Sequence, residues 1–178
     1  KRIRSKIMAI LPILTVPDTI LKKKSKPVKK VDDKLRAFMD DMLESMYDAP
    51  GVGLAAVQVG KLLRILVIDV SPDDEDPDPH FYINPEITWT SEDLAVYNEG
   101  CLSVPEQYAD IERPAECKAT FIDYDGENQE IHAKGLLATC IQHEMDHLNG
   151  IVFIDYLSKI KRSMFVRKVK KFVKEKEE

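Results

Sequence analysis

Residues 136–150 read LLATCIQHEMDHLNG, and this stretch predicts the helix around which the rest of the chain folds. On a helix, residues four positions apart lie on one face, so the imidazoles of His143 and His147 can bind the same metal ion. Glu144 follows the first histidine and is then directed at a water molecule beside that ion. Asn149-Gly150 is typical of a left-handed helix end. The alternative to a metal site is a solvated helix with two surface histidines.

A second segment, Glu99-Gly100-Cys101-Leu102-Ser103, supplies a third candidate ligand upstream of this helix. We expect Cys101 between the end of a strand and a turn that contains Pro105. One thiolate and two imidazoles make three protein ligands, as in catalytic zinc sites, whereas structural zinc sites use four. The alternative for Cys101 is a small core residue, which is the interpretation we favour for Cys117 and Cys140.

A third segment, at residues 51–58, reads GVGLAAVQ. Two glycines separated by one residue permit the close approach of another backbone. The segment lacks the Lys-Ser/Thr pair that follows the glycines of a phosphate-binding loop. It therefore predicts a tight wall that presents the side-chain amide of Gln58. Elsewhere, Asp146 is expected to support the site structurally, and His80 and His132 are interpreted as surface residues.

The segments around these motifs predict two more helices and several short strands. A helix is expected at residues 32–48, begun by Asp32 or Asp33 and ended by Ala49-Pro50-Gly51. Strands are expected at residues 64–70, 81–87 and 94–97, and a hairpin at 118–124 and 129–133 around Asp125-Gly126. Acidic residues and prolines at 71–80 indicate a solvated loop, and a last helix is expected from Ser158 to about Lys176. The first helix has a core-facing apolar stripe that consists of Leu35, Phe38, Met39, Met42, Leu43 and Met46.

The predicted fold class is α+β, with mixed, mainly antiparallel strands around a central metal-binding helix, an N-terminal helix and a C-terminal helix. The length of 178 residues and the 44% hydrophobic content favour one domain over residues 1–178. No apolar run approaches the roughly 18 residues that cross a bilayer, so no membrane partner is expected. Met8 is a candidate native start, in which case residues 1–7 lie upstream of it; otherwise they are native.

Charge and cysteine content indicate the compartment and the partners. Three cysteines are too few and uneven for a disulfide framework, so a reducing compartment is expected. The net charge of −5 argues against general nucleic-acid binding, and no specific DNA partner is expected. Residues 158–178 nevertheless carry nine Lys or Arg against three Glu, a net of +6, which leaves −11 for the remainder.

The three segments at residues 51–58, 99–103 and 142–147 resemble, in order and spacing, the motifs of the peptide deformylase family. The similarity extends over most of residues 8–157, including 123–126 and 153–157. It implies a bacterial-type enzyme of the branch with a C-terminal helix. Such an enzyme is a cytoplasmic, metal-dependent hydrolase that removes the formyl group from the N-terminal formyl-methionine of newly made polypeptides and releases formate.

The resemblance also implies a role for each residue that matches the family motifs. Glu144 would be general base and acid, and the Gln58 amide with the Leu102 backbone N–H would form the oxyanion hole. The metal ligands would be Cys101, His143 and His147. Backbone groups of Val52, Gly53 and Gly100 would pair with an extended substrate, and the methionine pocket would be lined by Val52, Leu136, Thr139 and Cys140.

Two positions depart from the family pattern, because Thr139 stands where a larger apolar residue is frequent and Tyr108 where an arginine is frequent. Both departures concern the pocket rather than the chemistry. The resemblance implies Fe²⁺ in the cell, with Zn²⁺ or Ni²⁺ in purified protein, since thiolate and imidazole suit all three ions. It also implies a ribosome contact through the basic C-terminal helix at residues 158–178.

Two other functions use the same metal ligands. A zinc peptidase shares His-Glu-x-x-His but draws its third ligand from downstream, whereas no histidine follows His147 and Cys101 lies 42 residues before His143. The other alternative is a non-catalytic metal-binding module, in which Glu144 and Gln58 would have no function. The order of the three motifs favours the hydrolase.

Overall fold

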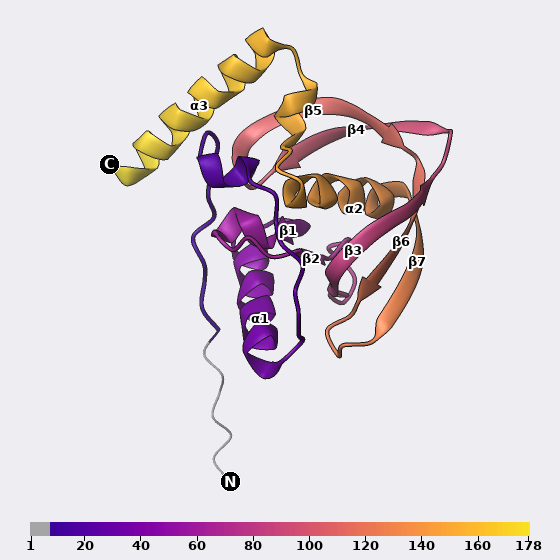
Figure 1. Ribbon diagram of the computed structural model, residues 1–178. Coiled ribbons are helices and arrows are strands. Elements are labelled where there is room, and N and C mark those ends of the chain that lie inside the picture. Colours follow the sequence, from indigo (N-terminus) through magenta and orange to yellow (C-terminus); the bar gives the residue numbers. More distant parts are fainter. Residues whose placement is uncertain (1–7) are drawn as a thin grey trace.

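The computed structural model describes residues 8–178 and contains three α-helices, three short 3₁₀ helices and seven strands (Figure 1). The helices are α1 (Asp33–Asp48), α2 (Gly135–Leu148) and α3 (Lys159–Glu177), and the 3₁₀ segments are η1 (Thr19–Lys22), η2 (Ala56–Val59) and η3 (Phe153–Tyr156). The proposed start at Met8 concerns residues 1–7, which lie outside the described part of the chain. None of the helices in residues 8–178 is long and apolar enough to cross a membrane.

The strands form two antiparallel sheets. The larger contains five strands in the order β1 (Gly53–Ala55), β2 (Ile65–Ile68), β3 (His80–Thr90), β6 (Glu116–Ile122) and β7 (Asn128–Lys134). The smaller pairs β4 (Leu94–Cys101) with β5 (Val104–Pro114). α2 lies between the sheets, with β4 and β5 on one side and β1 and β2 on the other (Figure 1). The predicted α+β class with a central helix is confirmed.

The helix boundaries follow from local chemistry that the sequence displays. Asp32 caps α1, because its carboxylate accepts a hydrogen bond from the Leu35 N–H at 2.9 Å. At the end of α2, Gly150 has a φ of +77°, a left-handed conformation that suits glycine after a helix. Ser158 caps α3 by accepting from the Lys161 N–H at 3.2 Å. All three predicted helices are therefore confirmed to within a residue or two.

Apolar packing fixes the position of the central helix. Ala138, Ile141 and Leu148 of α2 are buried against Leu66 and Tyr82 of the large sheet. The predicted stripe of α1 forms a second cluster with that sheet, in which Met39, Met42 and Met46 are inaccessible to solvent. The stripe is thus a core face, as expected, and α2 is held rigidly at the centre of the molecule.

Two strands and one turn differ from the sequence prediction. β1 and β5 were not expected, and Pro105 lies inside β5 rather than in a turn, because the turn after Cys101 consists of Leu102 and Ser103 alone. β5 pairs only with β4, so its other edge tolerates a proline that lacks a donor N–H. Its charged residues alternate with the buried Ala109 and Ile111, which hides the apolar signal of a strand.

Candidate metal centre

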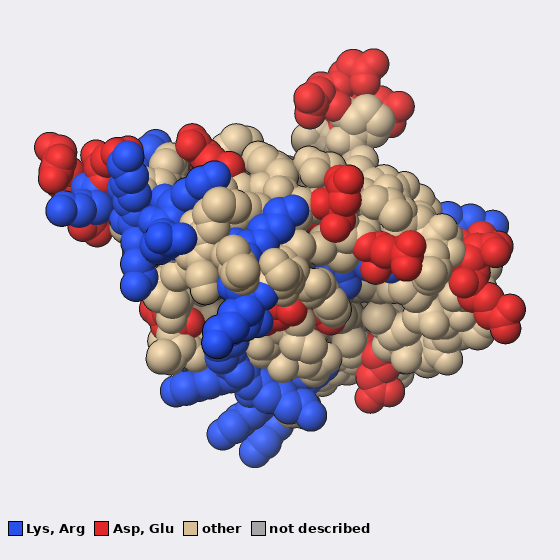
Figure 2. Space-filling model, turned by 90° about the horizontal axis from the view of Figure 1, so that it is seen from above, with Lys and Arg blue, Asp and Glu red and all other residues tan. Residues whose placement is uncertain are grey.

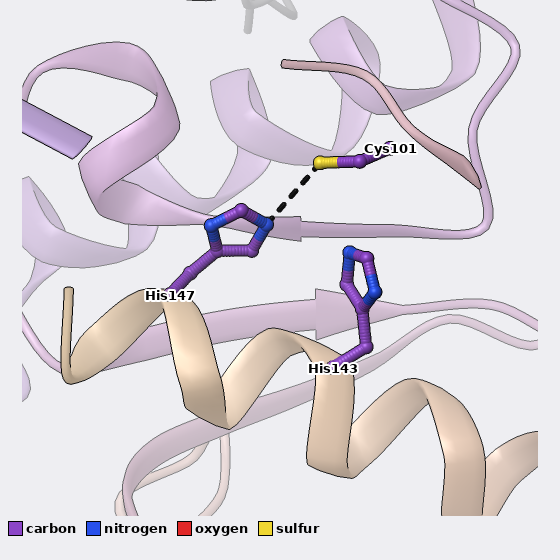
Figure 3. Close-up of side chains that lie close together, drawn as sticks. All are labelled: Cys101, His143 and His147. Atoms are coloured by element: carbon purple, nitrogen blue, oxygen red, sulfur yellow. Dashed lines mark hydrogen bonds between the residues drawn. The ribbon is translucent and has the colours of Figure 1, made fainter. Parts of the chain in front are cut away.

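Two elements bring three potential ligands to one point (Figure 3). His143 and His147 extend from one face of α2, and Cys101 reaches them from the end of β4. The ligand atoms all lie within 4.8 Å of one another, and the Cys101 Sγ is 3.3 Å from the His147 Nε2. The structure therefore assembles the same three side chains that the sequence motifs single out, although Cys101 lies 42 residues before His143 along the chain.

The orientation of His143 is set by a buried carboxylate. Its Nδ1 lies 2.8 Å from the Glu99 Oε1, so Glu99 holds a proton on Nδ1 and orients the ring with Nε2 on the side away from this carboxylate. Glu99 also accepts two hydrogen bonds from Arg113, at 2.7 and 3.0 Å. Burial acts to raise the pKa of Glu99, but its hydrogen bonds with His143 and Arg113 outweigh burial and hold the pKa below the ordinary value. Glu99 is therefore an anion in the folded protein.

Arg113 extends this support to the next turn of α2. Its Nη1 donates to the Asp146 carboxylate at 2.9 Å, and the Tyr156 hydroxyl donates to the same oxygen at 2.7 Å. One guanidinium from β5 thus ties Glu99 of β4 to Asp146 of α2. Asp146 therefore has the structural role expected of it, because its bond with Arg113 links α2 to β5.

The two histidines among the candidate ligands differ in protonation in the metal-free protein. Burial acts to lower the pKa of His143, but hydrogen bonds with Cys101 and Glu99 raise it well above 6.5, so the protein alone places a proton between these groups. Burial and the neighbouring His143 lower the pKa of His147 well below 6.5, which keeps its imidazole neutral. A neutral imidazole is the form that ligates a metal. The buried His147 Nδ1 has no hydrogen-bond partner among the described residues.

Glu144 lies beside the ligands without joining them. Its Oε1 is 3.9 Å from the His143 Nε2, and its buried Oε2 has no partner within residues 8–178. Burial raises the pKa of Glu144 to about 7, so the carboxyl group can take up and release a proton near neutral pH. A Cβ at Gly53 would lie 2.7 Å from Oε1, so the absence of a side chain at that position leaves room for the carboxylate.

These observations fit a divalent metal ion. One sulfur and two imidazole nitrogens are donors suited to zinc and to neighbouring transition metals. Cys117 and Cys140 do not compete for this role, because burial raises the pKa of their thiols to about 11 and about 12. An orphaned carboxylate oxygen and an acidic surround are also what a cation-binding site requires.

The side-chain amide of Gln58 is fixed behind Cys101. Its Oε1 accepts from the Ala55 N–H at 2.9 Å, and its Nε2 donates to the Ser103 Oγ at 3.0 Å and lies 3.5 Å from the Cys101 Sγ. The amide is buried and is held by these hydrogen bonds, with its NH₂ group directed at the Cys101 Sγ. Leu102 directly follows Cys101, so its backbone N–H belongs to the same turn.

A cavity of about 900 Å³ opens onto the ligands. The predicted site residues that line it are Val52, Gly53, Gly100, Leu102, Leu136, Thr139 and Cys140, together with Cys101, His143 and Glu144. Gln58 and His147 do not line the cavity, because both are buried behind Cys101. His80 and His132 are exposed and pair with Asp78 and Glu116, so both are surface residues, as expected.

Sequence reasoning missed Arg113 and the positioning roles of Glu99 and Ser103. Glu99 and Ser103 lie within the motif around Cys101, and this position could have indicated that they support the site. Arg113 lies in β5, which was not predicted, and no local pattern connects it to α2.

Comparison with known proteins gives consistent results. Residues 10–163 match the family model described as polypeptide deformylase. A peptide deformylase of Mesorhizobium japonicum is 56% identical over 169 residues, which cover 95% of this chain and 96% of the relative. Another from Phenylobacterium zucineum is 56% identical over 167 residues, covering 94% and 99%. The crystal structure of peptide deformylase from Ehrlichia chaffeensis has a TM-score of 0.90 and 45% identity, covering 94% of this chain and 99% of that one.

Proposed function

Since the chain belongs to the peptide deformylase family, we propose that Cys101, His143 and His147 hold its catalytic ion and that Glu144 transfers the protons. The chain is a metal-dependent hydrolase that removes the formyl group from N-terminal formyl-methionine. The observation that carries the residue assignment is the convergence of the three ligand atoms within 4.8 Å beside a buried carboxylate whose pKa is about 7. The whole of residues 1–178 is proposed as one catalytic domain.

Proton transfer is the task proposed for Glu144. A divalent ion at this site, when bound, supplies Lewis-acid polarisation of the formyl oxygen. Glu144 accepts a proton from the water that attacks the formyl carbon and then delivers it to the departing amine nitrogen. A pKa of about 7 suits both steps, because the group is neither a permanent acid nor a permanent anion near neutral pH.

The oxyanion that develops on the formyl group is stabilised by two donors. The Gln58 Nε2 is held next to Cys101 by its hydrogen bond to Ser103, and the Leu102 N–H lies in the adjoining turn. A preorganised donor of this kind contributes on the order of 3–4 kcal/mol to the transition state. Ser103 is therefore a positioning residue for Gln58.

The substrate peptide is proposed to lie extended between β1 and β4. β1 is the edge strand of the large sheet, so one row of its N–H and C=O groups is not taken by β2. The Val52 carbonyl already accepts from the Asp69 N–H at 2.8 Å, which leaves Gly53 as the main backbone partner on this side. On the other side, Gly100 falls in a break of the β4–β5 ladder and has no strand partner there.

The methionine side chain is proposed to occupy the apolar part of the cavity, lined by Val52, Leu136, Thr139 and Cys140. The test is formate release from formyl-Met-Ala beside acetyl-Met-Ala and an internal peptide, with metal-loaded protein. Release from the formyl peptide alone supports the proposal. Cleavage of the internal peptide bond would instead indicate a peptidase.

Fe²⁺ is proposed as the ion in the bacterial cytoplasm, with Zn²⁺ or Ni²⁺ able to replace it during purification. The mixed thiolate and imidazole set supports any of these ions, so availability decides among them. Elemental analysis of protein prepared with and without oxygen tests this. Iron in the anaerobic preparation, lost with activity on exposure to air, is the expected result, and zinc in both preparations would contradict it.

Besides formylated nascent chains, the ribosome is proposed as a partner of α3. Figure 2 shows Lys and Arg concentrated at the left and lower left of this face, with some acidic residues among them at the left end, whereas acidic residues predominate on the right. Phe165 and Val169 anchor α3 in the core, so charge substitutions are a cleaner test than removal of the helix. Replacing Lys161, Lys168 and Lys171 with glutamine should weaken ribosome co-sedimentation at low salt. The same change at Lys34, Lys61 and Lys134 is the matched control, and equal losses in the two variants would contradict a contact through α3.

A further inference from the structure

The cavity over the catalytic site continues to the last two turns of α3. Phe172, Val173, Lys176 and Glu177 line its outer part, in the same continuous space that contains Glu144. Its volume of about 900 Å³ lies near the upper end of the roughly 300–1,000 Å³ typical of ligand sites. The cavity therefore has a second region, away from the methionine pocket, that the formyl-methionine group does not occupy.

Phe172 is placed at the wall of this outer region without being part of the core. The buried Phe165 and Val169 anchor α3, and Val173 packs against the same apolar cluster. Phe172 is half-buried and belongs to none of the three apolar clusters formed by residues 8–178. The Lys176 Nζ lies 5.2 Å from its ring centroid, which holds the ring in place by a cation–π contact.

A bulge in β5 also lines this cavity. The β4–β5 ladder skips from the pair Cys101–Val104 to the pair Glu99–Ala109, which leaves the four residues 105–108 of β5 without a partner in β4. Within the bulge, Glu106 has a φ of +61°, a left-handed conformation that is strained for a residue with a side chain. Strain of this kind is found where a backbone shape serves a site. Glu106 and the exposed Tyr108 both line the cavity, as do the residues at the end of α3.

The residues that α3 contributes to the cavity lie beyond the range that the family model matches. The match to the family model ends at residue 163, whereas the residues that α3 contributes to the cavity begin at Phe172. The reacting groups are within the matched range, so the contribution of α3 concerns what is bound rather than the chemistry.

We propose that the end of α3 and the β5 bulge form a subsite for the peptide residues that follow the first two of the substrate, and that Phe172 gives it a preference for apolar side chains. The inference rests on the proposed placement of the peptide between β1 and β4. A chain extended from that placement leaves the catalytic site through the outer part of the same cavity. Phe172 and Val173 offer it an apolar wall, and Tyr108 a second aromatic surface.

A peptide series tests the subsite. Formyl-Met-Ala is extended by one to four residues, with leucine or glycine at each added position, and kcat/KM for formate release is measured with metal-loaded protein. In the wild type, leucine should be preferred over glycine at one or more added positions. In Phe172→Ala, this leucine-to-glycine ratio should fall about tenfold, mainly through KM, because contact with the ring is lost in ground state and transition state alike.

The matched control is Met164→Ala, a truncation of another half-buried residue on α3 that packs against the core and does not line the cavity. Its leucine-to-glycine ratio should equal that of the wild type. A ratio near one in the wild type, or equal ratios in the wild type and Phe172→Ala, would overturn the subsite. Failure of every formyl peptide to release formate would overturn the proposed function, and the inference with it.

A second measurement requires no change in α3. Formyl-Met-Ala peptides that carry benzoylphenylalanine at an added position are irradiated with the metal-loaded Glu144→Gln variant, and the adducts are mapped by mass spectrometry. Adducts within residues 172–176 or 105–108 are expected. Adducts confined to other surfaces would show that the peptide leaves the catalytic site by another path.

Discussion

Replacing Arg113 with methionine should weaken both the fold and the metal site. The guanidinium is buried and makes three hydrogen bonds, two to Glu99 at 2.7 and 3.0 Å and one to Asp146 at 2.9 Å. Methionine keeps most of the apolar stem but removes the charge and all three donors. Glu99 then remains as a buried carboxylate with His143 as its only side-chain partner among these bonds.

The expected cost follows from that uncompensated charge. Removing one partner of a buried ion pair typically costs about 3–5 kcal/mol in the free energy of unfolding. Glu99 also orients His143, and loss of such a supporting interaction lowers metal affinity by about 10–100-fold. The pKa of Glu99 should rise, because hydrogen bonding and charge from Arg113 help to hold it below its ordinary value.

Urea unfolding of metal-free protein measures the first effect, and competition with a chromophoric chelator measures the second. The matched control is Arg162→Met, because Arg162 is more exposed and lies 3.8 Å from Asp155. Such a surface pair contributes roughly 0–1 kcal/mol. The double variant Glu99→Gln/Arg113→Met should recover part of the loss, since it removes the stranded charge. Equal costs for the two arginine variants, or no recovery in the double variant, would refute the reasoning.

Three further predictions follow from the site geometry. Gln58→Ala should lower kcat by about 10²–10³-fold with little change in KM, as measured by steady-state formate release; a change in KM alone would contradict the oxyanion role. Gly53→Ala should lower kcat on the order of 10²-fold without loss of bound metal, because the new Cβ would lie 2.7 Å from Glu144 Oε1 and displace it; unaltered kcat would contradict this. Burial acts to raise the pKa of Asp69, but hydrogen bonds from neighbouring hydroxyl and N–H groups outweigh it and hold the pKa below 3.8. The stability that this carboxylate contributes is therefore present above 3.8 and lost as pH falls through its lower folded pKa, so the unfolding free energies of wild type and Asp69→Asn should converge in acid; a constant difference would argue against it.

The sequence predicts the elements whose signals are local. The spacing of Met39, Met42 and Met46 predicts α1, and Asp125-Gly126 predicts the β6–β7 hairpin, in which Gly126 has a φ of +90°. The three proposed ligands are also predictable, because two lie one helical turn apart and the third lies in a motif.

The features that cannot be predicted from the sequence depend on contacts between segments that are distant along the chain. β5 pairs on one edge only and carries charged residues at its exposed positions, so its pattern resembles a loop. Arg113 acquires its role only when β4, β5 and α2 meet. The approach of Phe172 to the cavity depends on how α3 docks, which helical spacing alone does not determine.

The central claim is that Cys101, His143 and His147 hold the ion and that Glu144 moves the protons. The most direct test is to measure metal content and formate release on one preparation of the Glu144→Gln variant. We expect one ion per chain, as in the wild type, with formate release from formyl-Met-Ala reduced by several orders of magnitude. A variant that lacks the ion would make Glu144 a ligand, and one that retains the ion and near-normal activity would leave the proton transfer to another group.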